Sequence, residues 1–374
     1  MEKIRVLELF CGIGGLHWGL KEIGVEFEIV AALEINPTVL ETYAVNFPDV
    51  RIVRRNIESL TAEEINEMNI DALVMSPPCQ PFCRAGNKQG LLDKRSSPLI
   101  NLLQILPRIR FKYIFVENVK GFETSDAHGE FVDMLTKIGF RYQEFLLSPV
   151  TLGIPNSRLR YYLIGKHSDL QWSFDLSDQV LDKLPETSGN NPIQLVKDRH
   201  RQRWLNYREK RIGRHATEGK LHGSSSEKFP SKYLESATSK SEELWYLNDI
   251  LEPNEFIFPE HKLSLEKLRK YWSALDIVTP FSTTSCCFTK AYFYYLTGSG
   301  SILDINGNDK IESDEVRQSE GKFRYFTPRE VSRLMCYPEE FKFPSNHSLK
   351  QKYKALGNSV NVSVVALMFA LLFS

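Results

Sequence analysis

The beginning of the sequence limits the possible folds more than any other stretch. Residues 4–10 are mostly apolar and indicate a buried first strand. Gly12, Gly14 and Gly15 follow at once, and apolar residues at helical spacing come next. A strand, a glycine turn and a helix in this order open the nucleotide-binding α/β folds, where glycines let the backbone approach a ligand. We therefore expect an α/β protein with a ligand site beside these glycines.

A carboxylate closes the second predicted strand. Residues 28–34 form the next apolar run, and Glu34 lies 20 residues after Gly14. An acid at this spacing can hydrogen-bond ribose hydroxyls, so NAD, FAD and S-adenosylmethionine are all candidate ligands. The spacing Gly12-x-Gly14-Gly15 differs from the dinucleotide fingerprint and favours a ligand without a pyrophosphate.

Strand and helix patterns continue to alternate along the chain. We predict further strands at residues 71–76, 112–119, 141–147 and 160–164, and helices at 99–109, 130–138 and 362–373. This order is typical of a doubly wound sheet with helices on both faces. The long loop between residues 79 and 98 is expected to be functional, because connections in such folds are usually short. Thr327, followed by Pro328 and Glu330, has the signature of a helix start.

A stiff, proline-bounded loop carries the first candidate for catalysis. Pro77 and Pro78 end the strand at 71–76, so Cys79 and the polar Gln80 lie just past its carboxyl end, where α/β sheets bind ligands. Most free cysteines are small buried hydrophobic residues, and Cys79 can be one of them. The two prolines and the polar Gln80 favour a rigid, presented loop with Cys79 as a nucleophile instead.

Three further charged residues are predicted at the same edge of the sheet. Glu117 lies near the end of a predicted strand, where burial would raise its pKa and let it hold a proton near neutral pH. Arg158 and Arg160, two residues apart on a strand entry, share a face and could grip a carbonyl or a phosphate. Each also has a plain structural explanation, a helix cap for the glutamate and solubility for the arginines. Their occurrence together favours a catalytic site.

A basic run follows the point near residue 168 where the alternation ends. Residues 197–214 contain eight Lys or Arg against two acids, a net charge of +6, with Trp204 and Tyr207 interleaved. A solvated helix face is the common explanation of such a run. The two aromatic residues favour a nucleic-acid surface, since they could stack on bases. The whole chain has a net charge of zero, so any such surface must be local.

The cysteines and the apolar runs indicate where the protein works. The six cysteines form no CxxC pair, so we expect no metal site and free thiols in a reducing compartment. We find no signal peptide and no apolar run of membrane-spanning length, and therefore expect a cytoplasmic or nuclear protein without a membrane partner.

Five ordered motifs then resemble those of one family. Phe10-x-Gly12-x-Gly14-Gly15, Pro77-Pro-Cys-Gln80, Glu117-Asn-Val119, Asn156-Ser-Arg-Leu-Arg160 and Gly357-Asn-Ser-Val360 are similar, in this order, to those of the cytosine-5 methyltransferases. Cys287-Phe-Thr289 with Tyr292, and residues 117–122, resemble the branch of tRNA (aspartate) cytosine-5 methyltransferases. The resemblance spans nearly the whole chain.

The resemblance implies a class I S-adenosylmethionine-dependent methyltransferase with a Rossmann-like doubly wound sheet. Cys79 would attack carbon-6 of a flipped cytosine, Glu117 would pair with its ring nitrogen-3 and exocyclic amine, and Arg158 and Arg160 would clamp the base and its loop. The residues implied to hold the cofactor are Phe10, Ile13, Gly14, Gly15, Glu34, Ile35, Asn56, Ile57, Ser76, Asn358, Ser359 and Val360. Those implied to contact the substrate are Asn118, Arg199, Arg201, Arg203, Cys287, Phe288, Thr289 and Tyr292.

Two residues depart from the family pattern. Cys83 stands where threonine is usual and places a second thiol, without an assigned role, near the site. Asn56 stands where many relatives have an aspartate that binds the cofactor adenine, and its amide oxygen can still accept a hydrogen bond.

The expected activity is methylation of cytosine 38 in a tRNA anticodon loop, with tRNA-Asp as substrate, through a covalent cysteine adduct. Residues 1–170 and 325–374 would form the catalytic domain and 171–324 a smaller target-recognition domain, flexible near 215–240. We expect a monomer. The alternatives are the same enzyme acting on DNA, a catalytically silent RNA-binding protein and a nicotinamide oxidoreductase. The intact Cys79, Glu117 and Arg158 argue against a silent protein, and the glycine spacing argues against the oxidoreductase.

Overall fold

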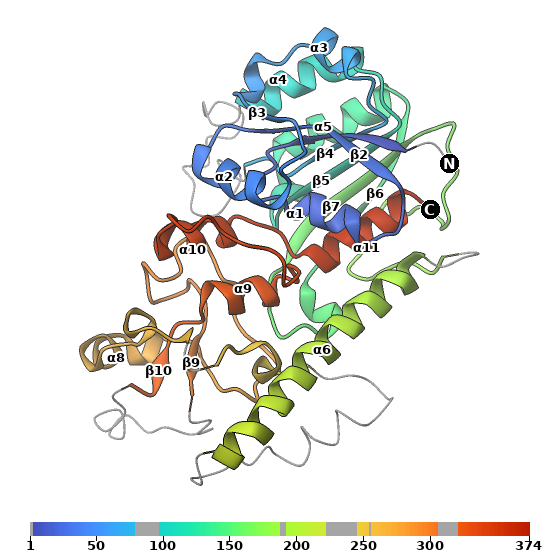
Figure 1. The fold of residues 1–374 in the computed structure, drawn as a ribbon. Helices are drawn as coiled ribbons and strands as arrows, with labels where there is room; N and C mark the ends of the chain where they lie inside the picture. Colours follow the sequence, from blue (N-terminus) through green and yellow to red (C-terminus); the bar gives the residue numbers. More distant parts are fainter. Residues whose placement is uncertain (1–2, 79–96, 188–191, 222–244, 254–255, 306–320) are drawn as a thin grey trace.

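A sheet of seven strands forms the centre of the fold (Figure 1), in the order β3-β2-β1-β4-β5-β7-β6. The computed structural model describes residues 3–78, 97–187, 192–221, 245–253, 256–305 and 321–374. The strands are β1 (Ile4–Leu9), β2 (Phe27–Glu34), β3 (Ile52–Arg54), β4 (Ala72–Met75), β5 (Tyr113–Val119), β6 (Phe140–Leu147) and β7 (Arg160–His167). In this sheet β7 runs antiparallel to both of its neighbours, β5 and β6.

Helices cover both faces of this sheet, which confirms the predicted doubly wound α/β architecture. One face packs against α1 (Gly15–Lys21), α2 (Pro37–Asn46) and α11 (Val362–Leu372). The other packs against α3 (Ala62–Glu67), α4 (Ser97–Ile105) and α5 (Asp126–Lys137). Successive side chains of a strand point to opposite faces. Val6 of β1 therefore belongs to the first core and Leu7 to the second.

The predicted helix start at Thr327 is confirmed. The Thr327 hydroxyl accepts a hydrogen bond of 3.1 Å from the Glu330 backbone N–H, and the Glu330 carboxylate accepts one of 2.8 Å from the Thr327 N–H. This reciprocal capping satisfies two donors that the first turn of α9 (Pro328–Leu334) would otherwise leave unpaired.

The most apolar helix among the described residues is a core helix. A stretch of 18 residues within 349–372, a range that includes α10 (Leu349–Gly357) and α11, has a mean hydropathy of 1.8 and the length of a membrane span, but 89% of this stretch is buried inside the protein. The expectation that no apolar stretch reaches that length was wrong. Every side chain of α11 is buried, so its hydrophobicity is explained by packing against the sheet.

A second, smaller sheet lies beyond the central one (Figure 1), with strands β8 (Ile277–Val278), β9 (Ile302–Asp304) and β10 (Phe323–Arg324). Its surroundings include α8 (Leu265–Tyr271) and the long α6 (Pro192–Leu221). The short 3₁₀ helices within the described residues are η1 (Ile57–Ser59), η4 (Leu106–Arg108), η5 (Phe122–Thr124), η6 (Pro149–Leu152), η7 (Leu247–Ile250), η9 (Pro259–His261) and η10 (Trp272–Ala274).

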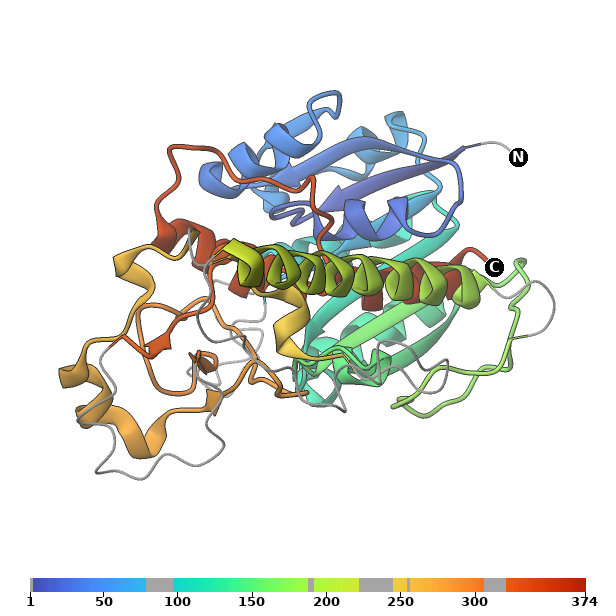
Figure 2. The same cartoon turned by 60° about the horizontal axis from the view of Figure 1, so that its bottom comes forward.

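The long α6 joins the two parts of the molecule. It lies along α11 (Figure 2) and also contacts η7. The division into domains at 170 and 325 stays a prediction. Of the segment predicted to be flexible, residues 215–221 are helical and 222–240 lie outside the described residues.

The register of the sheet brings distant parts of the sequence to one edge. β1, β2, β4 and β5 are parallel, so their carboxyl ends share this edge. Because β7 runs the opposite way, its first residue, Arg160, pairs with Val119 at the end of β5. The predicted meeting of Glu117 with the arginine pair therefore follows directly from strand order.

Candidate functional site

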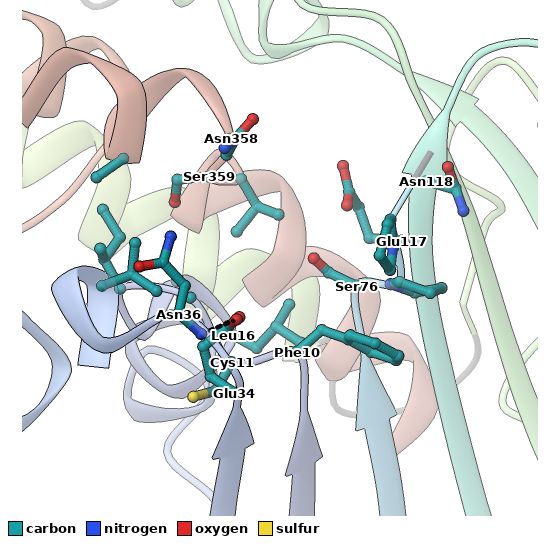
Figure 3. A pocket seen from close by; sticks show the side chains of 18 of the residues that line it. Phe10, Cys11, Leu16, Glu34, Asn36, Ser76, Glu117, Asn118, Asn358 and Ser359 are labelled. Atoms are coloured by element: carbon teal, nitrogen blue, oxygen red, sulfur yellow. Dashed lines mark hydrogen bonds between the residues drawn. The ribbon is translucent and has the colours of Figure 1, made fainter. Parts of the chain in front are cut away.

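A cavity of about 660 Å³ opens at the carboxyl edge of the sheet. The ends of β1, β2, β4 and β5 form its floor, and residues 289–290 and 355–360 close it from the other side. The predicted site residues that line it are Phe10, Ile13, Gly15, Glu34, Ile35, Asn56, Ile57, Ser76, Glu117, Asn118, Arg158, Arg160, Thr289, Asn358, Ser359 and Val360. In Figure 3, Glu34 and Asn36 lie on one side of this site, and Glu117 and Asn118 lie on the other.

The backbone around Glu34 fixes its carboxylate in place. Its Oε1 accepts hydrogen bonds of 2.9 Å from the N–H groups of both Ile35 and Asn36. Among the described residues nothing binds Oε2, so that oxygen can accept from a ligand hydroxyl. The Ile35 side chain is exposed beside it and offers an apolar surface to a flat ring. A carboxylate next to an apolar wall suits a nucleoside.

Two predicted cofactor residues, Asn56 and Gly14, have structural roles within the protein. The Asn56 oxygen already accepts a hydrogen bond of 3.2 Å from the Glu58 N–H and caps η1, which leaves one lone pair for a ligand. Gly14 does not line the cavity; a Cβ there would lie 2.5 Å from the Phe47 ring, and its φ of 82° is left-handed. Packing and backbone conformation, rather than approach to a ligand, require this glycine.

The site fits S-adenosylmethionine in length as well as in chemistry. Glu34 ends β2 and Glu117 lies near the end of β5, and the strands β1 and β4 lie between β2 and β5 in the sheet. Three strand spacings amount to about 14 Å, which an extended nucleoside with an amino-acid chain can cover. At the far end the Asn118 Nδ2 is buried and has no hydrogen-bond partner among the described residues. An orphaned buried donor of this kind favours a polar ligand group beside it.

The surroundings of Glu117 favour the protonated form of its carboxyl group. Burial raises the pKa of its carboxyl, and the nearby Arg160 and Arg158 and a hydrogen bond from Ser76 oppose this only in part. The Arg160 Nε lies 3.6 Å from Glu117 Oε1. A buried carboxyl with a raised pKa can donate a hydrogen bond to a ring nitrogen, as the sequence predicted.

Arg158 has a structural role that the sequence did not predict. Its side chain is 2% exposed and donates from Nη1 to the Phe288 carbonyl at 3.1 Å and to Cys287 Sγ at 3.4 Å. Its Nη2 donates to the carbonyls of Gly357, at 3.2 Å, and Ser359. Both terminal nitrogens are thus occupied by the protein, and the residue joins the 287–288 segment to the 357–359 turn. Its buried Nε has no hydrogen-bond partner among the described residues and the side chain lines the cavity, so the clamp on a base stays a prediction.

The predicted substrate motif at 287–292 is mostly structural. Phe288 and Tyr292 are buried, and the Tyr292 hydroxyl donates to the Ser301 carbonyl at 2.8 Å. The expectation that these two side chains contact the substrate directly was therefore wrong. Thr289 does line the cavity. Cys287 lies against both arginines; burial raises the pKa of its thiol, but Arg158 and Arg160 outweigh burial and lower it.

The aromatic residues of the basic run are buried, contrary to expectation. Trp204 is fully buried and Tyr207 nearly so, and neither can stack on a base. Arg208 is also buried and forms two hydrogen bonds, of 3.0 and 2.8 Å, with the Asp249 carboxylate. This face of α6 therefore belongs to the core, not to a nucleic-acid surface.

Two arginines of the same run anchor α6 to α1. Arg203 Nη2 lies 2.5 Å from Glu22 Oε1, and both side chains are largely buried. Arg199 donates to the carbonyls of Lys21 and Glu22, at 3.2 and 2.6 Å, where α1 ends. The buried ion pair corrects the assignment of Arg203 to substrate, whereas Arg199 is exposed and its predicted contact with substrate stays a prediction. Arg201 is exposed, and its predicted contact with substrate stays a prediction.

Some residues of the site lie outside what sequence reasoning found or what the structure describes. Asn36 and Lys290 line the cavity and were missed. Asn36 caps α2 just before Pro37, a helix-start signature directly after Glu34 that could have indicated it. The proposed nucleophile, Cys79, and the second thiol, Cys83, lie outside the described residues. The strand end that precedes them, with Pro77 and Pro78, forms part of the cavity wall.

Comparison with known proteins gives relatives that match along the whole chain and a solved structure with the same fold. The human protein named tRNA (cytosine(38)-C(5))-methyltransferase is 37% identical over 399 residues, which cover 100% of both chains. A Dictyostelium discoideum protein named DNA (cytosine-5)-methyltransferase is 33% identical over 380 residues, covering 100% of this chain and 95% of its own. The crystal structure of a Spodoptera frugiperda DNMT2 mutant superposes with a TM-score of 0.76 at 34% identity, over 100% of both chains.

A family model gives the last part of the comparison. The model described as C-5 cytosine-specific DNA methylase matches residues 4–373. Nearly the whole chain, including every segment that lines the cavity, is therefore accounted for by one family. The protein is a member of the C-5 cytosine-specific methylase family and an enzyme of the cytosine-5 methyltransferase class.

Proposed function

We propose that this enzyme methylates carbon-5 of cytosine 38 in a tRNA anticodon loop, with tRNA-Asp as its substrate. The observation that carries the proposal is the full-length similarity to a human protein named for that reaction. The cavity adds chemical support, because it offers a nucleoside-binding carboxylate at one end and a buried acid at the other.

The cofactor would be S-adenosylmethionine, held by Glu34, Ile35 and the 358–360 turn. When bound, it supplies an electrophilic methyl group. The protein's task is then to make carbon-5 of the cytosine a nucleophile, because a neutral cytosine ring attacks poorly.

Cys79 and Glu117 divide this task between them. The Cys79 sulfur forms a bond to carbon-6, and the electrons of the carbon-5–carbon-6 double bond become available at carbon-5. Glu117 donates its proton toward ring nitrogen-3 and so stabilises the charge that builds up in the ring. After methylation, water that reaches the cavity accepts the proton on carbon-5, the double bond forms again, the sulfur leaves as a thiolate, and Glu117 recovers its proton from ring nitrogen-3.

Methylation of tRNA and duplex DNA by the purified protein tests the substrate. We expect bisulfite sequencing of a tRNA pool to show a new methylated cytosine at position 38, foremost in tRNA-Asp, with little change in the DNA. Faster methylation of DNA than of tRNA would refute the tRNA proposal and favour the DNA enzyme. Absence of turnover with both substrates, despite RNA binding, would favour the catalytically silent protein.

Two cysteine variants test the covalent step. Cys79→Ala should abolish methylation but leave cofactor and RNA binding intact, because the loss falls on the transition state. Cys83→Ala should keep most of the activity. RNA with 5-fluorocytosine at the target should trap a covalent complex, because fluorine at carbon-5 blocks the proton loss that releases the enzyme. An adduct mapped to Cys83 by mass spectrometry would contradict the assignment.

We further propose that the enzyme works as a monomer in the cytoplasm or the nucleus. Analytical ultracentrifugation and imaging of a fluorescent fusion test the two statements separately. A stable dimer, or a fusion confined to membranes, would contradict them.

A further inference from the structure

A short turn beside the cavity presents two aromatic side chains to solvent. The turn at residues 289–295 begins with Thr289, which lines the cavity. Tyr292 is buried, and Phe293 stacks on the Tyr353 ring of α10 at 5.2 Å. Phe293 has a left-handed φ of 75°, which reverses the direction of the backbone. The next two residues therefore point outward.

These two residues, Tyr294 and Tyr295, are the most exposed large hydrophobic residues among those described, at 60% and 67%. Their rings lie 6.2 Å apart. The Tyr294 and Tyr295 N–H groups both donate to the Ala291 carbonyl at 2.9 Å, and Ser299 donates to the Tyr295 carbonyl. The backbone beneath the rings is thus held, although the rings themselves face water.

Positive charge accompanies the two rings. The Lys350 ammonium lies 4.1 Å from the centre of the Tyr294 ring and 2.5 Å from its hydroxyl oxygen. Lys354 follows one helical turn later on α10 and is exposed, and Lys290 is exposed at the cavity wall. Within the part of the chain that the structure describes, none of these three lysines pairs with a carboxylate. The surface keeps its charge although the whole chain is neutral.

The tyrosines lie close to the place of catalysis. The helix that carries Lys350 also lines the cavity with Ala355 and Gly357. At 1.5 Å per residue, Lys350 and Ala355 are about 8 Å apart along the axis of α10. A nucleic-acid strand with its target base in the cavity would therefore pass the two tyrosines with its neighbouring nucleotides.

We propose that Tyr294 and Tyr295, with Lys350 and Lys354, form a stacking surface for unpaired bases next to the target cytosine. The inference rests on the proposed function, because an anticodon loop offers such bases in single-stranded form. Aromatic side chains stack on bases of any identity, and nearby lysines bind the phosphates between them. This surface replaces the one expected from Trp204 and Tyr207, which are buried.

A fluorescent base measures stacking directly. Anticodon stem-loop RNA with 2-aminopurine at either nucleotide beside the target is titrated with the parent protein and three variants. The variants are Tyr294→Ala/Tyr295→Ala, Tyr294→Phe/Tyr295→Phe, which keeps the rings, and Phe256→Ala/Phe258→Ala, which removes two other exposed aromatic residues as a matched control. Circular dichroism confirms that each variant is folded.

We expect the parent, the tyrosine-to-phenylalanine variant and the control to quench the 2-aminopurine and bind alike. The alanine pair should lose the quenching and bind about 5- to 150-fold more weakly for each stacked base. Lys350→Gln/Lys354→Gln should instead flatten the salt dependence of binding, by about one unit of slope for each lost phosphate contact.

Two outcomes would overturn the inference. One is unchanged affinity and quenching in the alanine pair. The other is a loss in the phenylalanine pair as large as that in the alanine pair, which would assign the effect to the hydroxyls. A parent protein that neither binds nor methylates tRNA would refute the proposed function itself, and this is seen before any variant is made.

Discussion

A buried carboxyl under the cavity makes the strongest prediction about stability. Glu8 of β1 is fully buried and accepts a hydrogen bond of 2.7 Å from the Tyr43 hydroxyl, which also lies 2.9 Å from His17 Nδ1. Among the described residues its second oxygen, Oε1, has no partner. Burial raises the pKa of Glu8 from 4.5 to about 8, and the bond from Tyr43 only partly opposes this. The carboxyl is therefore protonated in the folded protein at neutral pH.

The magnitude follows from the difference between the two pKa values. Above pH 4.5 the unfolded chain ionises Glu8 while the native state keeps the proton until about pH 8. The native state thus binds more protons, and its stability falls as pH rises through this window, by about 1.4 kcal/mol for each pH unit. The total is about 5 kcal/mol, which is a large part of the stability of an ordinary protein.

The test replaces the carboxyl by an amide that cannot ionise. Urea unfolding of the parent and Glu8→Gln is measured from pH 5.5 to 7.5. The variant should gain about 3 kcal/mol on the parent across these two pH units, because only the parent loses stability through this group. Glu67→Gln, which changes an exposed glutamate on α3, serves as the control and should follow the parent. Parallel profiles for the parent and Glu8→Gln would refute a protonated Glu8.

Three further predictions concern the site and α6. Glu34→Ala should weaken S-adenosylmethionine binding by about 1–3 kcal/mol, measured by calorimetry, because a polar group of the ligand loses its partner; unchanged affinity would remove Glu34 from the site. In the parent, kcat/KM should fall above the raised pKa of Glu117 as the acid loses its proton, whereas Glu117→Gln should be flat there; identical pH profiles would contradict an acid role. Arg203→Ala should destabilise the protein by about 3 kcal/mol through the unpaired Glu22, yet leave the salt dependence of RNA binding unchanged; a flatter slope would return Arg203 to the RNA surface.

The sheet and the cofactor end of the site were predictable because their signals are local. An apolar run, a glycine turn and an acid at ribose distance determine where Glu34 lies, without any distant contact. The edge shared by Glu117 and Arg160 also followed, since strand order and direction decide it. The capping pair Thr327 and Glu330 is three residues apart and needs no tertiary information.

Side chains whose partners lie far away in sequence could not be assigned in this way. Arg208 is buried because Asp249 neutralises it from 41 residues away, and no local pattern indicates that pairing. Arg158 has the charge of a substrate clamp, but the carbonyls of Gly357 and Ser359 occupy it. Charge and spacing show which residues can bind an anion, whereas burial decides which of them are free to do so.

The contact between α1 and α11 has a consequence for synthesis on the ribosome. α1 begins at Gly15 and α11 at Val362, and a Cβ at Gly19 would lie only 2.6 Å from the Val365 side chain. The strands that emerge first therefore keep one apolar face uncovered until α11 has been translated. A nascent chain stalled before Ser359 would lack both this cover and the Ser359 turn of the cavity. We expect such a product to be bound by chaperones and degraded rather than to persist as a partial enzyme.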